Sequence, residues 1–439
     1  MRVDIIGAGI SGLATAYHLV RQRPDLELHV WEKDASPGGL AGCFSAEGFT
    51  VEKFYHHIFK GDTHLIGLLA ELGLSDDLMW RPANTGSYYF QQAYRLSSPI
   101  DILKFQPLPF IDRIRLGLMV VHARTVRDWR KLDAISAEEY IRRTAGSKVF
   151  EVLWQPLLHG KFGDLSGDIS AAWLWSKLVD RGGSRDRKGH EVLGYLRGGL
   201  GRMFDRLMEE IEKAGATVHL SSGVEAMETE GDRIGSIVTR EGTFPTDLVV
   251  SGAQLPDLHK LLPASTEALA NQLSRIEFLG NVCLVLVLPR QLSQFYWTNV
   301  MDPDAPFVGI IEQTNWVDPA DLNRKRLVYI SAYCPATDER FGMEANELLE
   351  FYLPWIQKLF PSFSSKEVER ALVWKADYAQ AVVTTGYSAL VPEIRTPLPN
   401  LLLCTMAQIF PQDRQVSNGV KLAKQTARIA ADYLQEKGT

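Results

Sequence analysis

The N-terminal stretch, residues 3–17, limits what this chain can fold into more than any other part. Its apolar residues 3–6 have strand character and lead directly into a Gly-x-Gly-x-x-Gly motif made by Gly7, Gly9 and Gly12, which opens a helix-like segment. In this motif the first glycine permits a tight turn, the second lets the backbone approach a pyrophosphate, and the third lets the helix pack on the strand. Such a helix directs free N–H groups and the positive end of its dipole at phosphates. The stretch therefore predicts a strand–turn–helix unit that binds a dinucleotide.

An acidic residue stands where a dinucleotide site needs one. A second strand-like run, residues 26–31, ends at Glu32, which follows Gly12 by 20 residues. At this spacing a carboxylate accepts hydrogen bonds from a ribose hydroxyl. The alternative is a tight strand–helix turn that binds nothing, and Glu32 argues against it.

A second glycine cluster follows this acid and favours FAD over NAD. Residues 33–42 contain Gly38, Gly39 and Gly42. Glycines admit backbone conformations and close contacts that other residues do not, so this loop could run flush against an extended cofactor. A surface loop without a ligand is the alternative interpretation.

Composition and charge exclude several classes of protein. The 439 residues carry a net charge of −6, without a basic tail or a low-complexity run, so we expect no nucleic-acid partner. The four cysteines are scattered and form no Cys-x-x-Cys pair. We therefore expect neither a metal site nor a disulfide framework, which suits a reducing compartment.

The sequence also predicts where the protein resides. The first strand-like run begins at Val3, which leaves no room for a signal peptide, and no apolar run is long enough to span a bilayer. We expect a cytoplasmic protein.

The chain resembles the FAD-dependent amine oxidase, protoporphyrinogen oxidase and phytoene desaturase group, which also takes in UDP-galactopyranose mutase. Besides the motifs above, four later segments carry the resemblance: residues 195–203, 216–224, 399–406 and 418–420. In the second of them the final valine of a strand meets the adenine end of FAD through its backbone. Together the motif and the resemblance give these FAD-binding residues: Gly7, Gly9, Gly12, Glu32, Lys33, Gly38, Gly39, Leu40, Val224, Asp413 and Val420.

Two positions depart from the pattern of this group. Many members have an arginine before the glycine pair, where this chain has Pro37, and the C-terminal strand usually ends in Ala-Gly-Asp, where this chain has residues 404–407 (Cys-Thr-Met-Ala). Asp413 follows a few residues later. A covalent flavin stays open, but Cys404 lies in an apolar strand and is better interpreted as a small core residue, so we favour non-covalent binding.

The predicted fold class is α/β: a Rossmann-type FAD-binding domain with a second, α+β substrate domain built on a mostly antiparallel sheet. We assign residues 1–80, 190–255 and 395–439 to the FAD domain. Residues 81–189, with a helical insertion, and 256–394 form the substrate domain. Long apolar runs in the last range predict a sheet that covers the flavin.

Two histidines and a lysine are the catalytic candidates. Residues 47–60 alternate as a strand does and contain His56 and His57, which an extended chain points to opposite sides. In the related proteins this region passes the flavin, so one of them is expected to face flavin or substrate, unless both are structural. Histidine titrates near neutrality and suits proton transfer. Some amine oxidases hold a lysine near flavin N5, at another place in their sequence, which makes Lys161 a further candidate.

The predicted function is that of an FAD-dependent oxidoreductase that takes hydride from a C–H bond and returns electrons to oxygen or a quinone. There is no second Gly-x-Gly-x-x-Gly, so we expect no separate NAD(P)H domain. A non-redox sugar-nucleotide mutase is one alternative, although its basic pocket would need Arg181, Arg185 and Arg187, which look like part of a solvated loop at 180–188. A flavin-free binding protein on the same fold is the other.

The expected partner is a small organic molecule, which the resemblance implies to be lipophilic. The helix-like residues 111–124 present a wide apolar face with three arginines. In protoporphyrinogen-oxidase-like proteins the equivalent insertion touches the membrane or admits the substrate, so peripheral membrane contact is one interpretation and a helix packed on its own core is the other. The oligomeric state is open.

Overall fold

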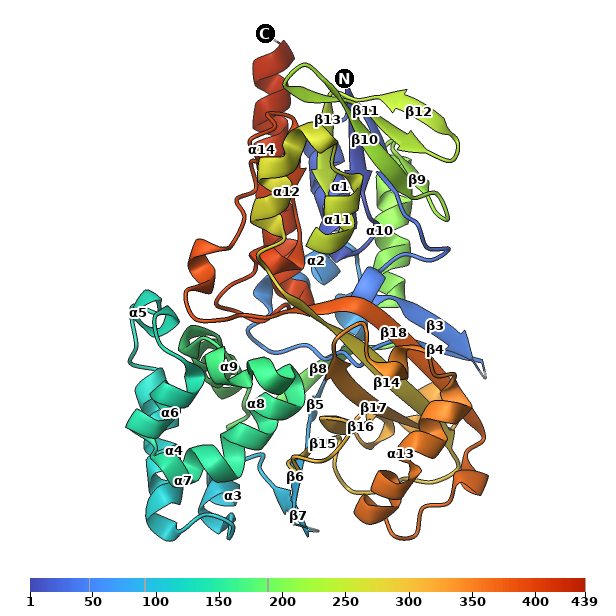
Figure 1. Ribbon diagram of the computed structural model, residues 1–439. Helices are drawn as coiled ribbons and strands as arrows, with labels where there is room; N and C mark the ends of the chain where they lie inside the picture. Colours follow the sequence, from blue (N-terminus) through green and yellow to red (C-terminus); the bar gives the residue numbers. More distant parts are fainter. Residues whose placement is uncertain (47, 91, 188, 439) are drawn as a thin grey trace.

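The protein has an upper part that contains both chain ends and a lower part in which helices and a large sheet lie side by side (Figure 1). The computed structural model describes residues 1–46, 48–90, 92–187 and 189–438.

A five-stranded parallel sheet organises the upper part. Its strands, in spatial order, are β19 (Leu401–Leu403), β13 (Leu248–Ser251), β1 (Arg2–Ile6), β2 (Glu27–Trp31) and β9 (Thr217–His219). Alternate strand residues point to opposite faces. Val3 and Ile5 pack against one apolar cluster, and Ile6 packs against another. Both faces of this sheet are therefore buried.

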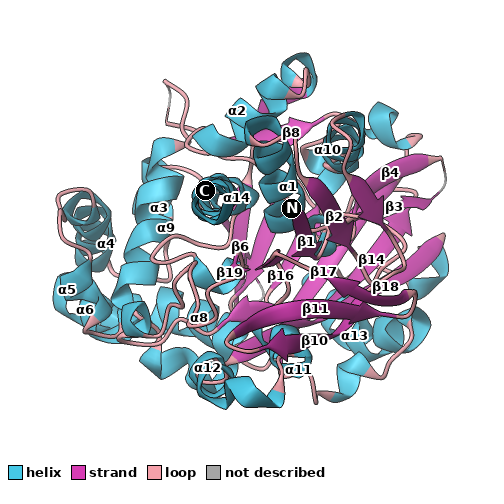
Figure 2. Cartoon of the chain, turned by 90° about the horizontal axis from the view of Figure 1, so that it is seen from above, coloured by secondary structure: helices cyan, strands magenta, loops and turns pink. Residues whose placement is uncertain are grey.

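Helices cover one face of this sheet and a small antiparallel sheet covers the other. The helices are α1 (Ile10–Gln22), α10 (Gly201–Lys213) and α14 (Val416–Gly438), which Figure 2 shows beside β1 and β2. The opposite face packs against β10 (Val224–Glu230), β11 (Arg233–Thr239), β12 (Gly242–Pro245), α11 (Leu255–Leu261) and α12 (Glu267–Leu273). This arrangement is the Rossmann-type FAD-binding fold that the sequence predicts.

A seven-stranded sheet forms the lower right of Figure 1. Its strands, in spatial order, are β18 (Arg370–Ala381), β14 (Phe278–Leu288), β17 (Arg326–Cys334), β16 (Gly309–Glu312), β15 (Trp297–Val300), β6 (Thr85–Tyr89) and β7 (Gln92–Arg95). Neighbours are antiparallel except for β6 and β15. The mostly antiparallel sheet is therefore confirmed.

The central strand β14 shows why this sheet is apolar throughout. Its even-numbered residues 282–288 pack under α13 (Ala345–Leu359), whereas Cys283, Val285 and Val287 belong to a second apolar cluster with Val51 and Leu193. Because both faces are covered, the run has no polar alternation.

The helical insertion forms the lower left of Figure 1. It contains α3 (Pro99–Lys104), α4 (Phe110–Ala123), α5 (Arg130–Asp133), α6 (Ala137–Thr144), α7 (Ser147–Val149), a π-helical turn (Phe150–Trp154), α8 (Gln155–Phe162) and α9 (Ala171–Gly183). The strand pairs β3 (Cys43–Ala46) with β4 (Phe49–Glu52) and β5 (Leu78–Pro82) with β8 (Val192–Leu196), together with α2 (Thr63–Glu71), connect the parts.

The strands of the parallel sheet all come from the three ranges assigned to the FAD domain. Helix α11 begins at the last residue of a predicted FAD range and continues into the predicted substrate range, but its Leu258 shares an apolar cluster with Val249 of the parallel sheet. The position of the boundary between the domains stays a prediction.

Candidate cofactor and substrate site

The two glycine loops lie against each other. Gly9 and Gly38 form a parallel bridge, and the N–H of Gly38 donates to the carbonyl of Ala8 over 2.8 Å. Gly38 has a φ of 107°, a conformation that only glycine adopts without strain. The contact explains why a second glycine cluster follows Glu32: the two loops share one narrow space.

Gly12 and Gly9 are glycines for different reasons. A Cβ on Gly12 would lie 1.9 Å from the carbonyl oxygen of Gly7, so the close packing of α1 on β1 requires glycine there. A Cβ on Gly9 would meet no protein atom within 4 Å. Gly9 therefore faces a space that the chain leaves open at the N-terminus of α1, where no side chain caps the helix. A pyrophosphate fits this space.

Glu32 lies at the carboxyl end of β2, beside both loops. Its carboxylate accepts hydrogen bonds from the N–H of Ala8 (2.7 Å) and of Asp34 (2.9 Å). Burial raises the pKa of this carboxyl, and these two N–H groups oppose the shift. Each carboxylate oxygen keeps a second lone pair for a ribose hydroxyl. Glu32 is therefore an acceptor that fits the ribose hydroxyls of FAD.

The segment predicted for the adenine end lies next to Glu32, with one correction. Val224 is not the last residue of the strand that begins at residue 216; that strand, β9, ends at His219, a turn follows, and Val224 is the first residue of β10. A Cβ on Gly223 would lie 2.9 Å from the Cβ of Lys33, so this turn packs on the Lys33 backbone. The ammonium of Lys33 pairs instead with Asp257 at 3.2 Å.

The C-terminal segment approaches the same loops. Ser11, in the first turn of α1, contacts the sulfur of Met406 at 3.9 Å, and Gly419 packs against Ile10. Val420 is buried among the helices that cover the parallel sheet, and Leu40 is half-buried in the short turn after the glycine pair. Cys404 is fully buried in the same apolar cluster as Val420, as a core residue would be.

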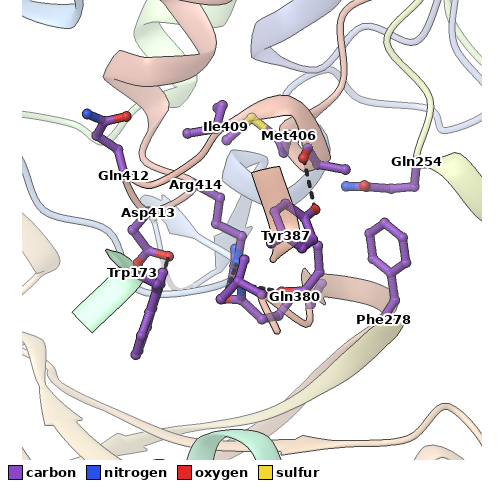
Figure 3. A pocket seen from close by; sticks show the side chains of 14 residues that line it. Trp173, Gln254, Phe278, Gln380, Tyr387, Met406, Ile409, Gln412, Asp413 and Arg414 are labelled. Atoms are coloured by element: carbon purple, nitrogen blue, oxygen red, sulfur yellow. Dashed lines mark hydrogen bonds between the residues drawn. The ribbon is translucent and has the colours of Figure 1, made fainter. Parts of the chain in front are cut away.

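A cavity adjoins this region, and Trp173, Asp413 and Arg414 are among the residues that line it. Lys177, which pairs with Asp413, and Lys161, whose Nζ lies 4.9 Å from the ring centre of Trp173, adjoin these residues. Met406 and Gln254, which follow β19 and β13 closely, also line it (Figure 3). The cavity thus lies at the carboxyl ends of β13 and β19.

His56 and His57 lie in an irregular segment that follows β4. The predicted strand over residues 47–60 is wrong beyond Glu52, where β4 ends, and Glu47 lies outside the described residues. The His56 Nδ1 lies 2.7 Å from the carbonyl oxygen of Phe54, and the His57 Nδ1 lies 3.2 Å from the hydroxyl of Tyr296. Burial lowers the pKa of His56 to about 4 and that of His57 to about 3. The expectation that they titrate near neutrality therefore does not hold.

Lys161 lies at the end of α8 among aromatic rings. Its Nζ is 4.9 Å from the ring centre of Trp173 and 5.5 Å from those of Phe162 and Tyr333. Burial lowers the pKa of Lys161 to about 8, although Asp413 opposes the shift. Cation–π contacts of this kind stabilise an ammonium that has left bulk water.

Asp413 forms an ion pair with Lys177 of α9 and accepts a hydrogen bond from the indole N–H of Trp173 at 3.4 Å. Burial alone would raise the pKa of Asp413, but the charges of Lys161, Lys177 and Arg414 outweigh it and hold the pKa far below its usual range. Figure 3 shows Asp413 and Trp173 facing each other. The carboxylate predicted for the cofactor is therefore held by cations of the helical insertion.

Arg414 is a wall residue that sequence reasoning missed. Its Nε donates to the side-chain oxygen of Gln380 (3.0 Å, Figure 3) and its Nη2 donates to the hydroxyl of Tyr333 (2.9 Å). Lys177 was missed as well. Arg414 adjoins the predicted Asp413, which was a usable signal, whereas nothing in the sequence marked Lys177.

The predicted solvated loop at residues 180–188 is wrong in its first half. Helix α9 continues to Gly183, so Arg181 is helical and lies 4.0 Å from Glu191. Arg185 donates to the carbonyl of Ser97 at 2.9 Å. Lys188 lies outside the described residues. Burial lowers the pKa of His57 most, and the positive charge of Arg181 lowers it further.

The described residues contain neither a candidate metal centre nor a candidate membrane span. Across residues 1–46, 48–90, 92–187 and 189–438, no three histidine, cysteine, aspartate or glutamate side chains are arranged to hold a metal ion. Within the same ranges no helix has both the length and the apolar character that a membrane span requires.

Comparison with known proteins gives the family. The family model described as "flavin containing amine oxidoreductase" matches residues 10–412. Among relatives, coproporphyrinogen III oxidase of Staphylococcus aureus is 23% identical over 51% of this chain, and chloroplastic protoporphyrinogen oxidase of Oryza sativa subsp. japonica is 29% identical over 41%. These matches cover 54% and 34% of those two proteins. The 15-cis-phytoene desaturase of Synechococcus elongatus is 22% identical over 100% of this chain and 98% of its own length.

Solved structures share the fold. A protein from Exiguobacterium sp. 255-15 assigned as a protoporphyrinogen oxidase superposes with a TM-score of 0.78 at 18% identity, over 98% of both chains. Reduced UDP-galactopyranose mutase superposes with a TM-score of 0.73 at 15% identity, over 98% of this chain and 94% of that one.

Proposed function

The chain belongs to the flavin containing amine oxidoreductase family and its cofactor is FAD, and on this premise we propose that it is an oxidoreductase of the oxidase, dehydrogenase or desaturase type that acts on a small organic substrate. The observation that carries the proposal is the contact between Ser11 of the glycine-loop helix and Met406, which also lines the cavity. Because of this contact, a cofactor bound at the loops and a substrate in the cavity would be neighbours.

Different residues of this chain would bind the cofactor and the substrate. The loop at Gly9 would hold the dinucleotide through backbone N–H groups and Glu32 through its carboxylate, while Gly38 lets the second loop pack on the first. Bound FAD would accept hydride from a substrate C–H bond at N5 and pass the electrons to oxygen or a quinone. The walls formed by β17, α8 and α9 exclude water and orient the substrate, which is the protein's main contribution in flavin enzymes.

The proposed roles of the three catalytic candidates differ. His56 and His57 are neutral at pH 7, because their pKa values of about 4 and 3 lie far below it, so they can donate or accept hydrogen bonds without charge. Lys161, with a pKa of about 8, is mostly protonated at pH 7 and acts there as a cation. It is the candidate whose pKa lies closest to neutrality.

The visible absorption spectrum of the purified protein tests the cofactor and the class. We expect a flavin spectrum, and heat should release a chromophore that behaves as FAD. Candidate substrates should then bleach the spectrum in the absence of oxygen. A protein that stays colourless after incubation with FAD would contradict the proposal and favour the flavin-free binding protein. Tight binding of UDP-galactopyranose without bleaching would favour the mutase instead.

A surface of the helical insertion supports peripheral membrane contact. Helix α4 packs on the core through Leu116, Met119 and Ala123, and its opposite face leaves Phe110, Ile111, Leu118 and Val121 exposed. Ile100 and Leu103 are exposed on the adjoining helix α3. We propose that this apolar surface, with Lys104 and Arg113 beside it, lies on an anionic membrane and gives a lipophilic substrate access.

Co-sedimentation with vesicles that contain anionic phospholipid tests this contact. The protein should pellet with the vesicles, and Leu118→Asp should release it. Phe351→Asp, on α13, is the matched control because Phe351 is also exposed but lies on another part of the molecule. Equal pelleting of wild type and Leu118→Asp would contradict the contact.

A further inference from the structure

The cavity wall holds more positive than negative charge. Arg414 lines the cavity, Lys177 pairs with the lining residue Asp413, and the Nζ of Lys161 lies 4.9 Å from the ring of the lining residue Trp173. The charge of Asp413 acts on all three cations. Further along α9, Arg181 lies 4.0 Å from Glu191, and Lys177 acts on the buried carboxyl of Asp180. His56 and His57 add none at neutral pH, since both are neutral there.

Asp413 is already engaged. Its carboxylate pairs with Lys177 and accepts the N–H of Trp173. Among the described residues, the ammonium of Lys161 donates no hydrogen bond to a protein acceptor, although it has three N–H groups. Arg414 uses its Nε and Nη2 for Gln380 and Tyr333, and its Nη1 meets no acceptor in the described part of the chain. Two cations thus keep free donors, one on the cavity wall and one beside it.

Tyr333 joins these two cations into one site. Its hydroxyl accepts the hydrogen bond of Arg414, and its ring lies 5.5 Å from the Nζ of Lys161. Phe162 and Trp173 complete the wall around Lys161. A cationic pair with unused donors between flat apolar walls is complementary to an aromatic or conjugated molecule that bears an oxyanion.

We propose that Lys161 and Arg414 bind an oxyanion, a carboxylate or a phosphate, of the organic substrate, and that the protein therefore selects acidic substrates over amines. This inference rests on the proposed function, because it assigns the cavity to the substrate. The oxyanion would accept hydrogen bonds from the free N–H groups of both side chains, and its charge would balance the excess positive charge of Lys161, Lys177 and Arg414 over Asp413.

Isothermal titration of the FAD-saturated protein with four probes of similar size tests the proposal. The probes are benzoate, phenyl phosphate, neutral benzamide and cationic benzylamine. Benzoate or phenyl phosphate should bind at least about tenfold more tightly than benzamide, since hydrogen bonds to charged groups contribute that much, and benzylamine should not bind. Whichever of benzoate and phenyl phosphate binds more tightly shows whether the site prefers a carboxylate or a phosphate. Equal binding of benzoate, phenyl phosphate and benzamide, or tighter binding of benzylamine, would overturn the proposal.

Substitutions of Lys161 test whether its ammonium binds the anion. Lys161→Met should weaken anion binding by about 10- to 100-fold, whereas Lys161→Arg should keep it within a few fold. Lys358→Met is the matched control, because Lys358 also lies over an indole ring, that of Trp355 at 4.2 Å, but belongs to α13. If Lys161→Met weakens FAD binding and leaves the anions unaffected, the ammonium serves the cofactor and the proposal is wrong. The heat of anion binding can be measured on a protein that has no flavin colour. A colourless protein would therefore contradict the proposed oxidoreductase function and leave the anion site to be decided by the titration.

Discussion

The glycine-loop region and the cavity differ in the groups that interact with charge: backbone N–H groups in the first and side chains in the second. In the glycine-loop region the backbone is the recognition element: N–H groups of Ala8 and Asp34 hold Glu32, and the N-terminus of α1 is left without a cap. In the cavity, side chains from α8, α9 and the segment before α14 meet around Asp413. The first region depends on where the chain runs, and the second depends on which side chains distant elements supply.

This difference determines how each region should respond to substitution. Backbone recognition is insensitive to most side chains but fails when a Cβ enters the path of the chain or the cofactor. A cluster of buried charged side chains loses stability when one partner is removed, because the remaining charges are still desolvated but have lost the opposite charge that offset this cost. The predictions that follow test this contrast.

Substitutions of Gly12 and Gly9 should separate folding from cofactor binding. Gly12→Ala places a Cβ 1.9 Å from a backbone oxygen, so we expect at least about 3 kcal/mol of destabilisation and no retained flavin. Gly9→Ala meets no protein atom, and its φ of −72° suits alanine, so the apoprotein should keep its stability while FAD binds at least about tenfold more weakly. Thermal unfolding and the ratio of flavin to protein absorbance measure both effects. Unchanged FAD affinity in Gly9→Ala would show that the space near Gly9 does not hold the cofactor.

Asp413→Asn should destabilise the protein by about 2–3 kcal/mol, because Lys177 loses its partner. The folded-state pKa of Asp413 is depressed, so its contribution is present above its unfolded pKa near 4 and is lost as the pH falls toward the folded value. The free energy of unfolding of the wild type should therefore fall below pH 4 more steeply than that of the variant. Denaturant unfolding at pH 7 and pH 3.5 measures this, and parallel profiles would contradict it.

Lys161→Met should stabilise the protein by about 1–2 kcal/mol at pH 7, opposite in sign to Asp413→Asn. The folded-state pKa of about 8 lies below the usual 10.5, so the folded protein binds fewer protons than the unfolded chain between these values. The wild type should therefore gain stability as the pH rises from 8 to 10.5, and the variant should not show this gain. Thermal unfolding across that range measures it, and a destabilised variant would show that the ammonium stabilises the fold.

Lys33→Met should have the smallest effect. The ammonium of Lys33 is exposed and pairs with Asp257 at the surface, so the free energy of unfolding should change by less than about 0.5 kcal/mol. FAD affinity should stay within about twofold, because we expect the backbone rather than the side chain to contact the cofactor. Titration of the apoprotein with FAD measures this. A tenfold loss would show that the glycine-loop region also uses cationic side chains.

The amino-acid sequence by itself determined the fold of the upper part and its cofactor. Gly7, Gly9, Gly12 and Glu32 lie within one strand–helix–strand unit, so their spacing along the chain sets their spacing in the molecule. The strands of the large sheet could also be predicted from their apolar runs, because a strand buried on both faces has no polar alternation. Local features failed where packing overrode propensity: β4 ends at Glu52, and α9 continues through Arg181.

Only the tertiary structure decided which charged side chains meet around Asp413. Lys161 and Lys177 belong to the helical insertion, Tyr333 belongs to the large sheet, and Arg414 precedes the last helix, so no local pattern relates them. Their protonation was equally hidden, since burial moves the pKa values of His56, His57 and Lys161 in ways that residue type does not reveal. The physical reason is range: backbone turns and strand periodicity are set by neighbours along the chain, whereas desolvation and charge pairing are set by neighbours in space.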